Sequence, residues 1–284
     1  MATTNNLPST NSLNLAYAAL GIFGVLLLPS VYITYKHGKP GIICWPIFVS
    51  YFGLRFASDA YLIIRKNDPE EPTTITMMTN AGGIVCLSLT LIGMIYEAVN
   101  IIPSHSKRWG RKIMLGVTHL GNTVGIGMAA YAGKPDDDAP GGVKNENLNK
   151  IGNMLMFLVM VVVLFWLWPA TKRVLSARQE VNYKASKALV MAAGPGIVLQ
   201  LIRLSYSITY AFNRIPSLDP VTGSFATRLV LMFGTQLCIV LVIIAGGWFS
   251  KDALPLSQIK VGGADVEMNR ASERLVRQQE AGVV

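Results

Sequence analysis

The chemistry in this sequence is concentrated in arginine side chains that interrupt long apolar stretches. Arg55 and Arg203 each lie well inside such a stretch, and Arg228 lies near the start of another. Because a charged side chain within lipid is costly, it usually faces the interior of a helical bundle and marks a functional site. Guanidinium groups bind carboxylates and phosphates through paired hydrogen bonds, so these arginines indicate a site for an anionic partner.

Helical spacing places other polar residues beside two of these arginines. Arg55 and Asp59 are four residues apart, so they can pair along one face of a helix. Arg203, Ser207 and Tyr210 follow at intervals of four and three residues and form one polar stripe on another helix. We therefore expect each of these helices to turn a polar face toward the centre of a bundle.

The depth of these residues along their helices places them in one half of the membrane. Arg55 and Arg203 lie ~13 Å from the outer ends of their helices, and Asp59 lies roughly 8 Å from its own. If the polar faces converge, three arginines meet one close acid, which gives the pocket a charge of about +2. The predicted ligand-binding residues are Arg55, Asp59, Asn80, Arg203, Ser207, Tyr210 and Arg228.

Simpler interpretations of two of the arginines stay open. Arg228 is close enough to a helix end to extend its head group to the membrane interface. Arg55 and Asp59 are also consistent with a structural ion pair within one helix. Arg203 lies deep and has no acid on its own helix, so we expect a ligand or a partner from another helix to satisfy it.

Seven apolar stretches must position these residues, and each is long enough to cross a hydrocarbon core, which takes roughly 20 helical residues. Charged residues are 14% of the chain and the mean hydropathy is +0.42, whereas soluble domains carry roughly 25% charged residues. Lipid requires each span to satisfy its own backbone hydrogen bonds, so the predicted fold is an all-α, polytopic membrane bundle. The helices are expected at residues 13–35, 41–64, 74–102, 113–132, 151–170, 188–212 and 225–250.

Lysine and arginine are distributed unevenly between the two sides of such a bundle. The N-terminal segment and the loops after the second, fourth and sixth helices contain six of them, whereas the other loops and the C-terminal tail contain sixteen. The richer side is cytosolic by the positive-inside rule. The sequence thus predicts an extracytosolic segment at 1–12, a seven-helix domain at 13–250 and a cytosolic tail at 251–284, with the N-terminus outside and the C-terminus inside.

Several function classes lack their sequence signals. The net charge of +9 is spread over short loops, with no basic surface interleaved with aromatics, so nucleic acid is not an expected partner. Asp59 and Glu97 are expected near opposite ends of the bundle and cannot act as a catalytic pair. We therefore predict no enzyme, no catalytic residue and no metal or cofactor site. Glu97 is expected near the cytosolic interface, and Trp45 in an aromatic belt.

Six short motifs occur in order along residues 13–250: Lys36-His37-Gly38, Trp45, Arg55, and the segments 80–83, 201–206 and 245–247. With these motifs the chain resembles a fungal family of seven-helix integral membrane proteins that is known only as a domain of unknown function. The resemblance implies a membrane location and a fold. It implies no particular activity.

Three functions remain open at the level of the sequence. A receptor- or sensor-like protein would bind an anionic or amphipathic small molecule in the outer pocket. A transporter or lipid translocator would use Pro195 as a hinge and would need a polar path through Gln236, Asn122 and His119. An intramembrane enzyme, the least favoured, would need two catalytic groups in one cavity. The expected surroundings are the lipid bilayer of the plasma membrane or an endomembrane, and the sequence specifies no cytosolic partner.

Overall fold

The computed structural model describes residues 10–64, 66, 74–102, 108–134, 143–218 and 224–254. The regular secondary structure of these residues is helical, and seven helices are long and apolar enough to cross a membrane. The prediction of an all-α fold with seven long helices is confirmed at that level. Most of the predicted N-terminal segment and cytosolic tail lies outside the described residues.

The helices overlap the stretches expected for them and in places extend beyond them. α5 continues past both ends of the expected stretch 151–170, because its terminal turns are polar but still form helix. In chain order the elements are α1 (Thr10–His37), η1 (Lys39–Gly41), α2 (Trp45–Ile64), α3 (Thr74–Asn100), α4 (Arg108–Ala132), α5 (Glu146–Ser176), α6 (Tyr183–Asn213), η2 (Pro216–Leu218), α7 (Phe225–Thr227), η3 (Arg228–Gly234) and α8 (Thr235–Ser250).

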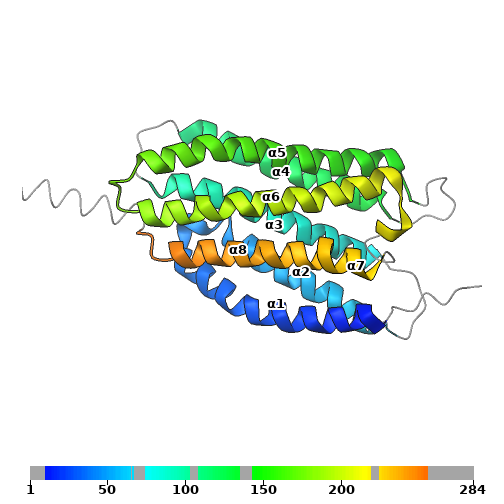
Figure 1. The fold of residues 1–284 in the computed structure, drawn as a ribbon. Helices are drawn as coiled ribbons and strands as arrows, with labels where there is room; N and C mark the ends of the chain where they lie inside the picture. The colour runs from blue at the N-terminus through cyan, green and yellow to red at the C-terminus, as the bar shows by residue number, and fades with distance from the viewer. Residues whose placement is uncertain are drawn as a thin grey trace, which may run out of the picture.

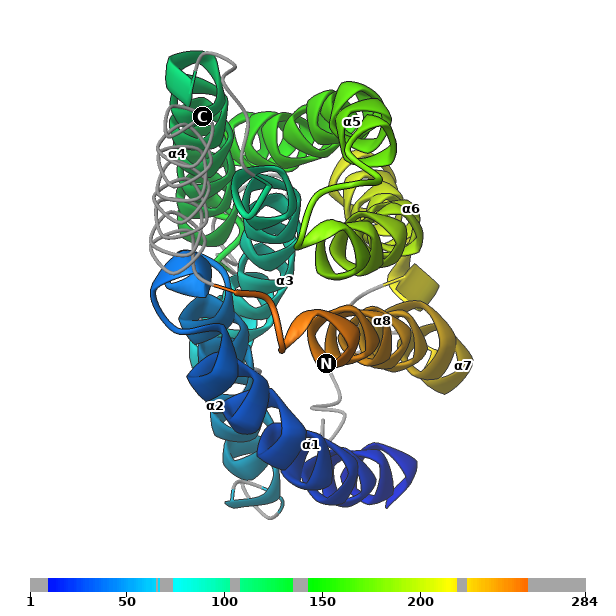
Figure 2. The same ribbon diagram turned by 90° about the vertical axis from the view of Figure 1, so that its left-hand side faces the viewer.

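α3 is the central helix of the bundle. In the view along the helix axes, α1, α2 and α8 lie on one side of α3, and α4, α5 and α6 lie on the other (Figure 2). Burial agrees with this position, since 78% of an 18-residue apolar window within Ala81–Asn100 is buried, against 17% of the corresponding window within Trp109–Ala132 in α4. The two faces of α3 therefore contribute to two different packing regions.

The bundle has two distinct ends because successive long helices run in opposite directions (Figure 1). We name these ends after the two ends of α1, as the Thr10 end and the His37 end. α2, α4 and α6 finish at the Thr10 end, where α3, α5 and α7 begin. α8 finishes at the His37 end. In the orientation predicted from the loop charges, the Thr10 end faces away from the cytosol.

Glycines bring α4 and α5 unusually close together. A Cβ atom added to Gly152 would lie 2.6 Å from both the Ala129 backbone N and the Gly125 backbone O. Small residues are what allow two helical backbones to approach this closely in a membrane-type bundle. The contact fixes the spacing of α4 and α5 at the Thr10 end.

Side chains from neighbouring helices satisfy the backbone carbonyls at the end of α3. Arg111 Nη1 donates to Val99 O at 3.0 Å, and Asn182 Nδ2 donates to Ile101 O at 2.9 Å. The last carbonyls of a helix have no partner within it, so bonds of this kind stabilise its end. Arg111 precedes the fourth helix expected at 113–132 and was therefore counted with a cytosolic loop. It is instead a buried residue of α4 with a structural role.

The seventh long helix is not a regular α-helix throughout. It begins as α7, continues through the seven-residue π-helix η3, and becomes α-helical again in α8. π-helical turns are rare and widen the helix locally. Regular α-helical spacing therefore does not describe the direction of Arg228 relative to the residues of α8.

Candidate functional site

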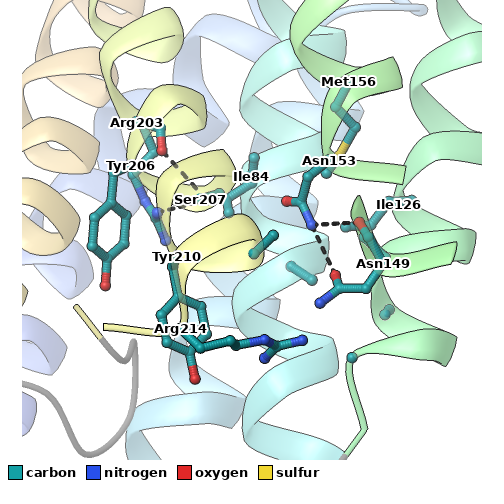
Figure 3. Close-up of a pocket in the computed structure, with 15 residues that line it drawn as sticks. Ile84, Ile126, Asn149, Asn153, Met156, Arg203, Tyr206, Ser207, Tyr210 and Arg214 are labelled. Carbon is teal, nitrogen blue, oxygen red and sulfur yellow. Dashed lines mark hydrogen bonds between the residues drawn. The ribbon is translucent and has the colours of Figure 1, made fainter. Parts of the chain in front are cut away.

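A cavity of about 110 Å³ lies at the Thr10 end between α3, α4, α5 and α6. Its apolar wall comes from small and aliphatic side chains of α3 and α4, among them Ala81, Ile84 and Ala129. Its polar wall comes from α5 and α6, whose side chains face each other across the cavity (Figure 3). The polar lining residues are Asn149, Asn153, Arg203, Tyr206, Ser207, Tyr210 and Arg214.

Arg203 is the deeper of the two charged groups that line the cavity. It lies ten residues before the end of α6 at Asn213, a distance of ~15 Å along the helix. Only 1% of the residue is exposed. Its Nη1 donates to Ser207 Oγ at 3.0 Å, and its guanidinium lies 5.0 Å from the centroid of the Tyr206 ring. Its Nε has no hydrogen-bond partner among the described residues.

Arg214 brings a second guanidinium group to the cavity. It caps the end of α6 in the left-handed conformation, with φ 47°, which ends the helix there. Its Cζ lies 5.3 Å from the centroid of the Tyr210 ring, and its side chain extends across that ring (Figure 3). The half-buried side chain has no partner for Nε or Nη2 among the described residues. Both nitrogens are therefore available as donors near the mouth.

Two asparagines in the first turns of α5 complete the polar wall. Asn153 Nδ2 donates to Asn149 Oδ1 at 2.8 Å and to Asn149 O at 2.9 Å. These bonds hold both amides on the face of α5 that points into the cavity (Figure 3). α5 itself starts at a capped end, because the Asn145 side chain accepts a hydrogen bond from Leu148 N.

The charge of the cavity is positive. Its described lining residues include Arg203 and Arg214 but no aspartate or glutamate. Glu146 lies outside the lining, pairs with Lys150 on α5 and also interacts electrostatically with Arg214. A buried cation without a compensating charge is unfavourable, and a guanidinium is best satisfied by two oxygens of one anion. The arrangement is suited to holding a carboxylate or a phosphate.

Arg55 and Asp59 lie outside the lining of the cavity, although Arg55 is close enough to Arg203 for the two cations to interact electrostatically. Arg55 Nε donates to Asp59 Oδ2 at 2.8 Å, and Nη1 donates to Gln236 Oε1 at 3.1 Å. The Arg55 guanidinium also lies 5.6 Å from the centroid of the Phe23 ring. Charge and hydrogen bonds are satisfied within the protein, which favours the interpretation of Arg55 and Asp59 as a structural pair.

Arg228 occupies a third position. It begins η3, is half-buried, and donates from Nη2 to Ser12 Oγ at 2.8 Å, so it links the seventh long helix to α1. Asn80 lies in the first turns of α3, and its side chain is outside the part of the chain that the structure describes. Arg55 is within electrostatic range of Arg203, but neither Arg55 nor Arg228 lines the cavity. Of the seven predicted residues, the cavity brings together Arg203, Ser207 and Tyr210.

The sequence prediction missed the cavity residues contributed by α5 and by the end of α6. Asn149 precedes the expected start of the fifth helix at residue 151, and Arg214 follows the expected end of the sixth. Both were therefore assigned to loops. The spacing of four residues between Asn149 and Asn153, just before a long apolar run, is the signal that would have placed them on one helical face.

Two residues expected at the membrane interface are buried instead. Glu97 is only 2% exposed, and Trp45 is fully buried and donates from Nε1 to Glu97 Oε2 at 2.8 Å. Trp168 and Trp248 are exposed near helix ends, as an aromatic belt requires. The difference arises because Trp45 begins α2 on the face that packs against α3, whereas the other two face outward. Distance from a helix end alone therefore does not predict whether a residue such as Glu97 or Trp45 is exposed at the membrane interface or buried between helices.

The residues expected to line a polar path for a transporter belong to different helices. Gln236 binds Arg55 on one side of α3, whereas His119 and Asn122 belong to α4 on the other. α6 passes Pro195 without interruption of the helix. Asn122 is fully buried, and neither of its amide atoms has a hydrogen-bond partner among the described residues. It lies one turn below Ile126, which lines the cavity.

The fold and the site together define a class: a helical bundle, compatible with a membrane protein, that encloses a cationic cavity at one end. Among the described residues no group of three or more His, Cys, Asp or Glu side chains is placed to hold a metal ion. Residues 10–253 match the model of the family described as "Domain of unknown function (DUF7702)", and the chain belongs to that family. No curated protein and no solved structure matches the chain.

Proposed function

We propose that the chain is an integral membrane protein that binds an anionic or amphipathic small molecule, in the manner of a receptor or sensor. The binding site is the cavity between α3, α4, α5 and α6. The observation that carries the proposal is Arg203, a buried guanidinium beside a cavity with no carboxylate among its described lining residues. A bound anion supplies the charge that Arg203 lacks and hydrogen-bond acceptors for the unbonded nitrogens of Arg203 and Arg214.

The outer surface of the bundle supports a location in lipid. Large apolar side chains are exposed on several helices, among them Leu28 on α1, Phe165 on α5 and Phe249 on α8. A soluble monomer rarely exposes large contiguous apolar patches. In a bilayer the same side chains contact acyl chains. The plasma membrane and an endomembrane are both consistent with this surface.

The size of the cavity limits what enters it. Pockets for drug-sized ligands typically hold roughly 300–1,000 Å³, whereas this one measures about 110 Å³. It accommodates a charged head group rather than a whole ligand of that size. We therefore propose a carboxylate or phosphate head group in contact with Arg203 and Arg214, with the apolar remainder of the molecule beyond the mouth.

Thermal unfolding of the detergent-purified protein tests this proposal with chemically matched probes. Oleate and oleoyl lysophosphatidic acid carry anionic head groups, while oleyl alcohol and oleylamine carry a neutral and a cationic one. A ligand present at 100 times its Kd stabilises the folded state by about 2.7 kcal/mol. We expect one or both anionic probes to raise Tm, and the neutral and cationic probes to leave it unchanged.

The Arg214→Gln variant tests whether the probe binds in this cavity. Arg214 is half-buried at the cavity mouth and makes no hydrogen bond from Nε or Nη2 to a described residue, so its loss should leave the unliganded Tm unchanged. Losing one hydrogen bond to a charged group should weaken anion binding roughly tenfold to a hundredfold. Equal shifts in the wild type and in Arg214→Gln would place the bound probe elsewhere and refute the proposed site.

A transporter is the second candidate, and Asn122 is the observation that favours it. Its unpartnered amide lies one turn below the cavity, where it could solvate a head group moving deeper between α3, α4 and α5. Flux of the stabilising anion into proteoliposomes separates the two functions. Flux that is lost in Asn122→Leu while Tm shifts persist supports transport, and binding without flux supports a receptor or sensor.

A further inference from the structure

A second group of buried ionisable side chains lies at the His37 end, outside the cavity. His37 of α1, Trp45 of α2 and Glu97 of α3 meet there beside the backbone of α8. His37 Nδ1 lies 2.6 Å from Glu97 Oε1, and His37 Nε2 lies 3.1 Å from the carbonyl oxygen of Gly247. The side chains of His37 and Glu97 are each only 2% exposed. These contacts join four helices around one imidazole.

The hydrogen positions in this cluster follow from which atoms can donate a hydrogen bond and which can only accept one. A backbone carbonyl only accepts hydrogen bonds, so His37 Nε2 must carry a hydrogen to contact Gly247 O. Ser250 Oγ donates to Gly246 O at 2.7 Å, which leaves its oxygen as an acceptor 3.3 Å from the same Nε2. The tautomer of His37 is thereby fixed by α8.

One further proton is required between His37 and Glu97. At 2.6 Å, Nδ1 and Oε1 are in contact only if one of them carries a hydrogen. The other carboxylate oxygen, Oε2, already accepts from Trp45 Nε1. The cluster therefore holds a single proton, shared between the imidazole and the carboxyl group, in addition to the hydrogen on Nε2.

Gain or loss of a proton disrupts this arrangement. If the shared proton leaves, lone pairs on Nδ1 and Oε1 face each other at contact distance. If a second proton arrives, either Oε1 and Nδ1 both carry hydrogens, or Oε2 carries one against the Trp45 donor. In both cases a buried polar contact between helices is replaced by repulsion, and a buried unpaired polar group is costly.

We propose that His37 and Glu97 form a proton-binding site whose occupancy by one proton fastens α1 and α3 to α8 at the His37 end. The site goes beyond the anion-binding cavity and does not depend on it, since the two lie at opposite ends of the bundle. It makes the packing of these helices responsive to pH, with greatest stability at intermediate pH and a loss toward both acid and alkali.

The titratable groups that the structure describes near the pair have partners of their own or face outward. The Cys44 thiol, which interacts electrostatically with Glu97, donates to Thr90 O at 3.3 Å. The ammonium of Lys36 lies over the Tyr32 ring, and that of Lys251 lies over the Trp248 ring. Lys39 and Asp252 are also at the His37 end of the bundle, and both are exposed.

The Glu97→Gln variant removes the shared proton while preserving the contacts. The new amide oxygen can accept from Trp45 and the amide nitrogen can donate to His37 Nδ1, while His37 Nε2 still donates to Gly247 O. We expect this variant to fold. Measured as Tm of the purified protein across the pH range, wild type should lose roughly 5 °C at each end relative to Glu97→Gln. His119→Gln, on α4, should follow the wild-type curve.

Nitrogen-15 NMR of histidine-labelled protein reports the protonation of His37 directly. In Glu97→Gln, His37 should show one protonated nitrogen at neutral pH, with Nε2 as the donor. In wild type the Nδ1 signal should show the shared proton across the pH range in which Tm is highest. Parallel Tm curves for wild type and Glu97→Gln, or a wild-type Nδ1 without a proton throughout that range, would overturn the proposal.

Discussion

Buried charged side chains in this bundle differ in how fully other groups of the protein satisfy their charge and hydrogen bonds. Arg55 and Glu97 have partners that satisfy both their charge and their hydrogen bonds, and they hold helices together. Arg203 donates to a hydroxyl group and lies against an aromatic ring, and the charged residue that interacts with it electrostatically is another cation, Arg55. A folded protein that keeps an incompletely satisfied guanidinium in its interior sacrifices stability there, and such sites often serve binding.

Replacing Arg203 by methionine tests this distinction at the residue scale. Methionine has a similar length and no charge, so unliganded Arg203→Met should be at least as stable as wild type, while the Tm shift with an anionic probe should disappear. The measurement is unfolding in detergent with and without the probe.

Arg55→Met serves as the contrasting variant, because it leaves the buried Asp59 without its partner. Removing one member of a buried ion pair costs roughly 3 kcal/mol, so this variant should unfold at lower temperature whether or not the probe is present. A comparable loss in unliganded Arg203→Met would show that Arg203 is structural.

At the scale of elements, the shape of the cavity depends on how closely α4 approaches α5. Gly152 lies between the two cavity asparagines in the sequence, and its contact with the α4 backbone sets the separation of the helices. Any change that separates them moves Asn149 and Asn153 away from α6. The binding wall and the glycine contact are therefore parts of one helix face.

Gly152→Ala should be destabilised and should also bind the anionic probe less well. Its Cβ would lie 2.6 Å from two backbone atoms, and overpacking of this kind typically costs about 1–3 kcal/mol. Gly127→Ala is the matched control on α4, since an added Cβ there meets nothing within 4 Å. It should be neutral or up to about 1 kcal/mol more stable through helix propensity. Unfolding curves of both variants decide this, and equal stability would contradict the role of the contact.

The sequence predicts where the long helices lie along the chain, but it does not predict which helix faces pack against each other. Apolar length predicts each long helix, because crossing lipid requires it, and the spacing of Arg203, Ser207 and Tyr210 predicts their common face. Which helix each polar face contacts depends on rotation and order in the bundle. That is why Arg55 was expected in the same pocket as Arg203 but bonds to Asp59 and Gln236 outside the cavity lining, and why Glu97 was expected at an interface but is buried against His37.

On the scale of the whole molecule, the orientation remains a prediction from loop charges. Sixteen Lys and Arg residues on one side against six on the other place the Thr10 end outside the cytosol. An Asn-x-Ser/Thr acceptor site introduced into the loop between α4 and α5 should therefore be glycosylated in a eukaryotic host. The same site introduced between α5 and α6 should not. A gel shift on glycosidase treatment measures both, and the reverse pattern would invert the topology.

Two contacts of α1 form only after segments much later in the chain have been synthesised. α1 is synthesised before the other six long helices described, yet its His37 ring and its Ser12 hydroxyl bind groups on α8 and η3, which follow those helices in the chain. Until the seventh long helix is inserted, His37 and Glu97 lack the α8 side of their surroundings. A nascent chain halted before Phe225 therefore lacks the Gly247 carbonyl and the Ser250 hydroxyl that enclose the His37 ring on its α8 side.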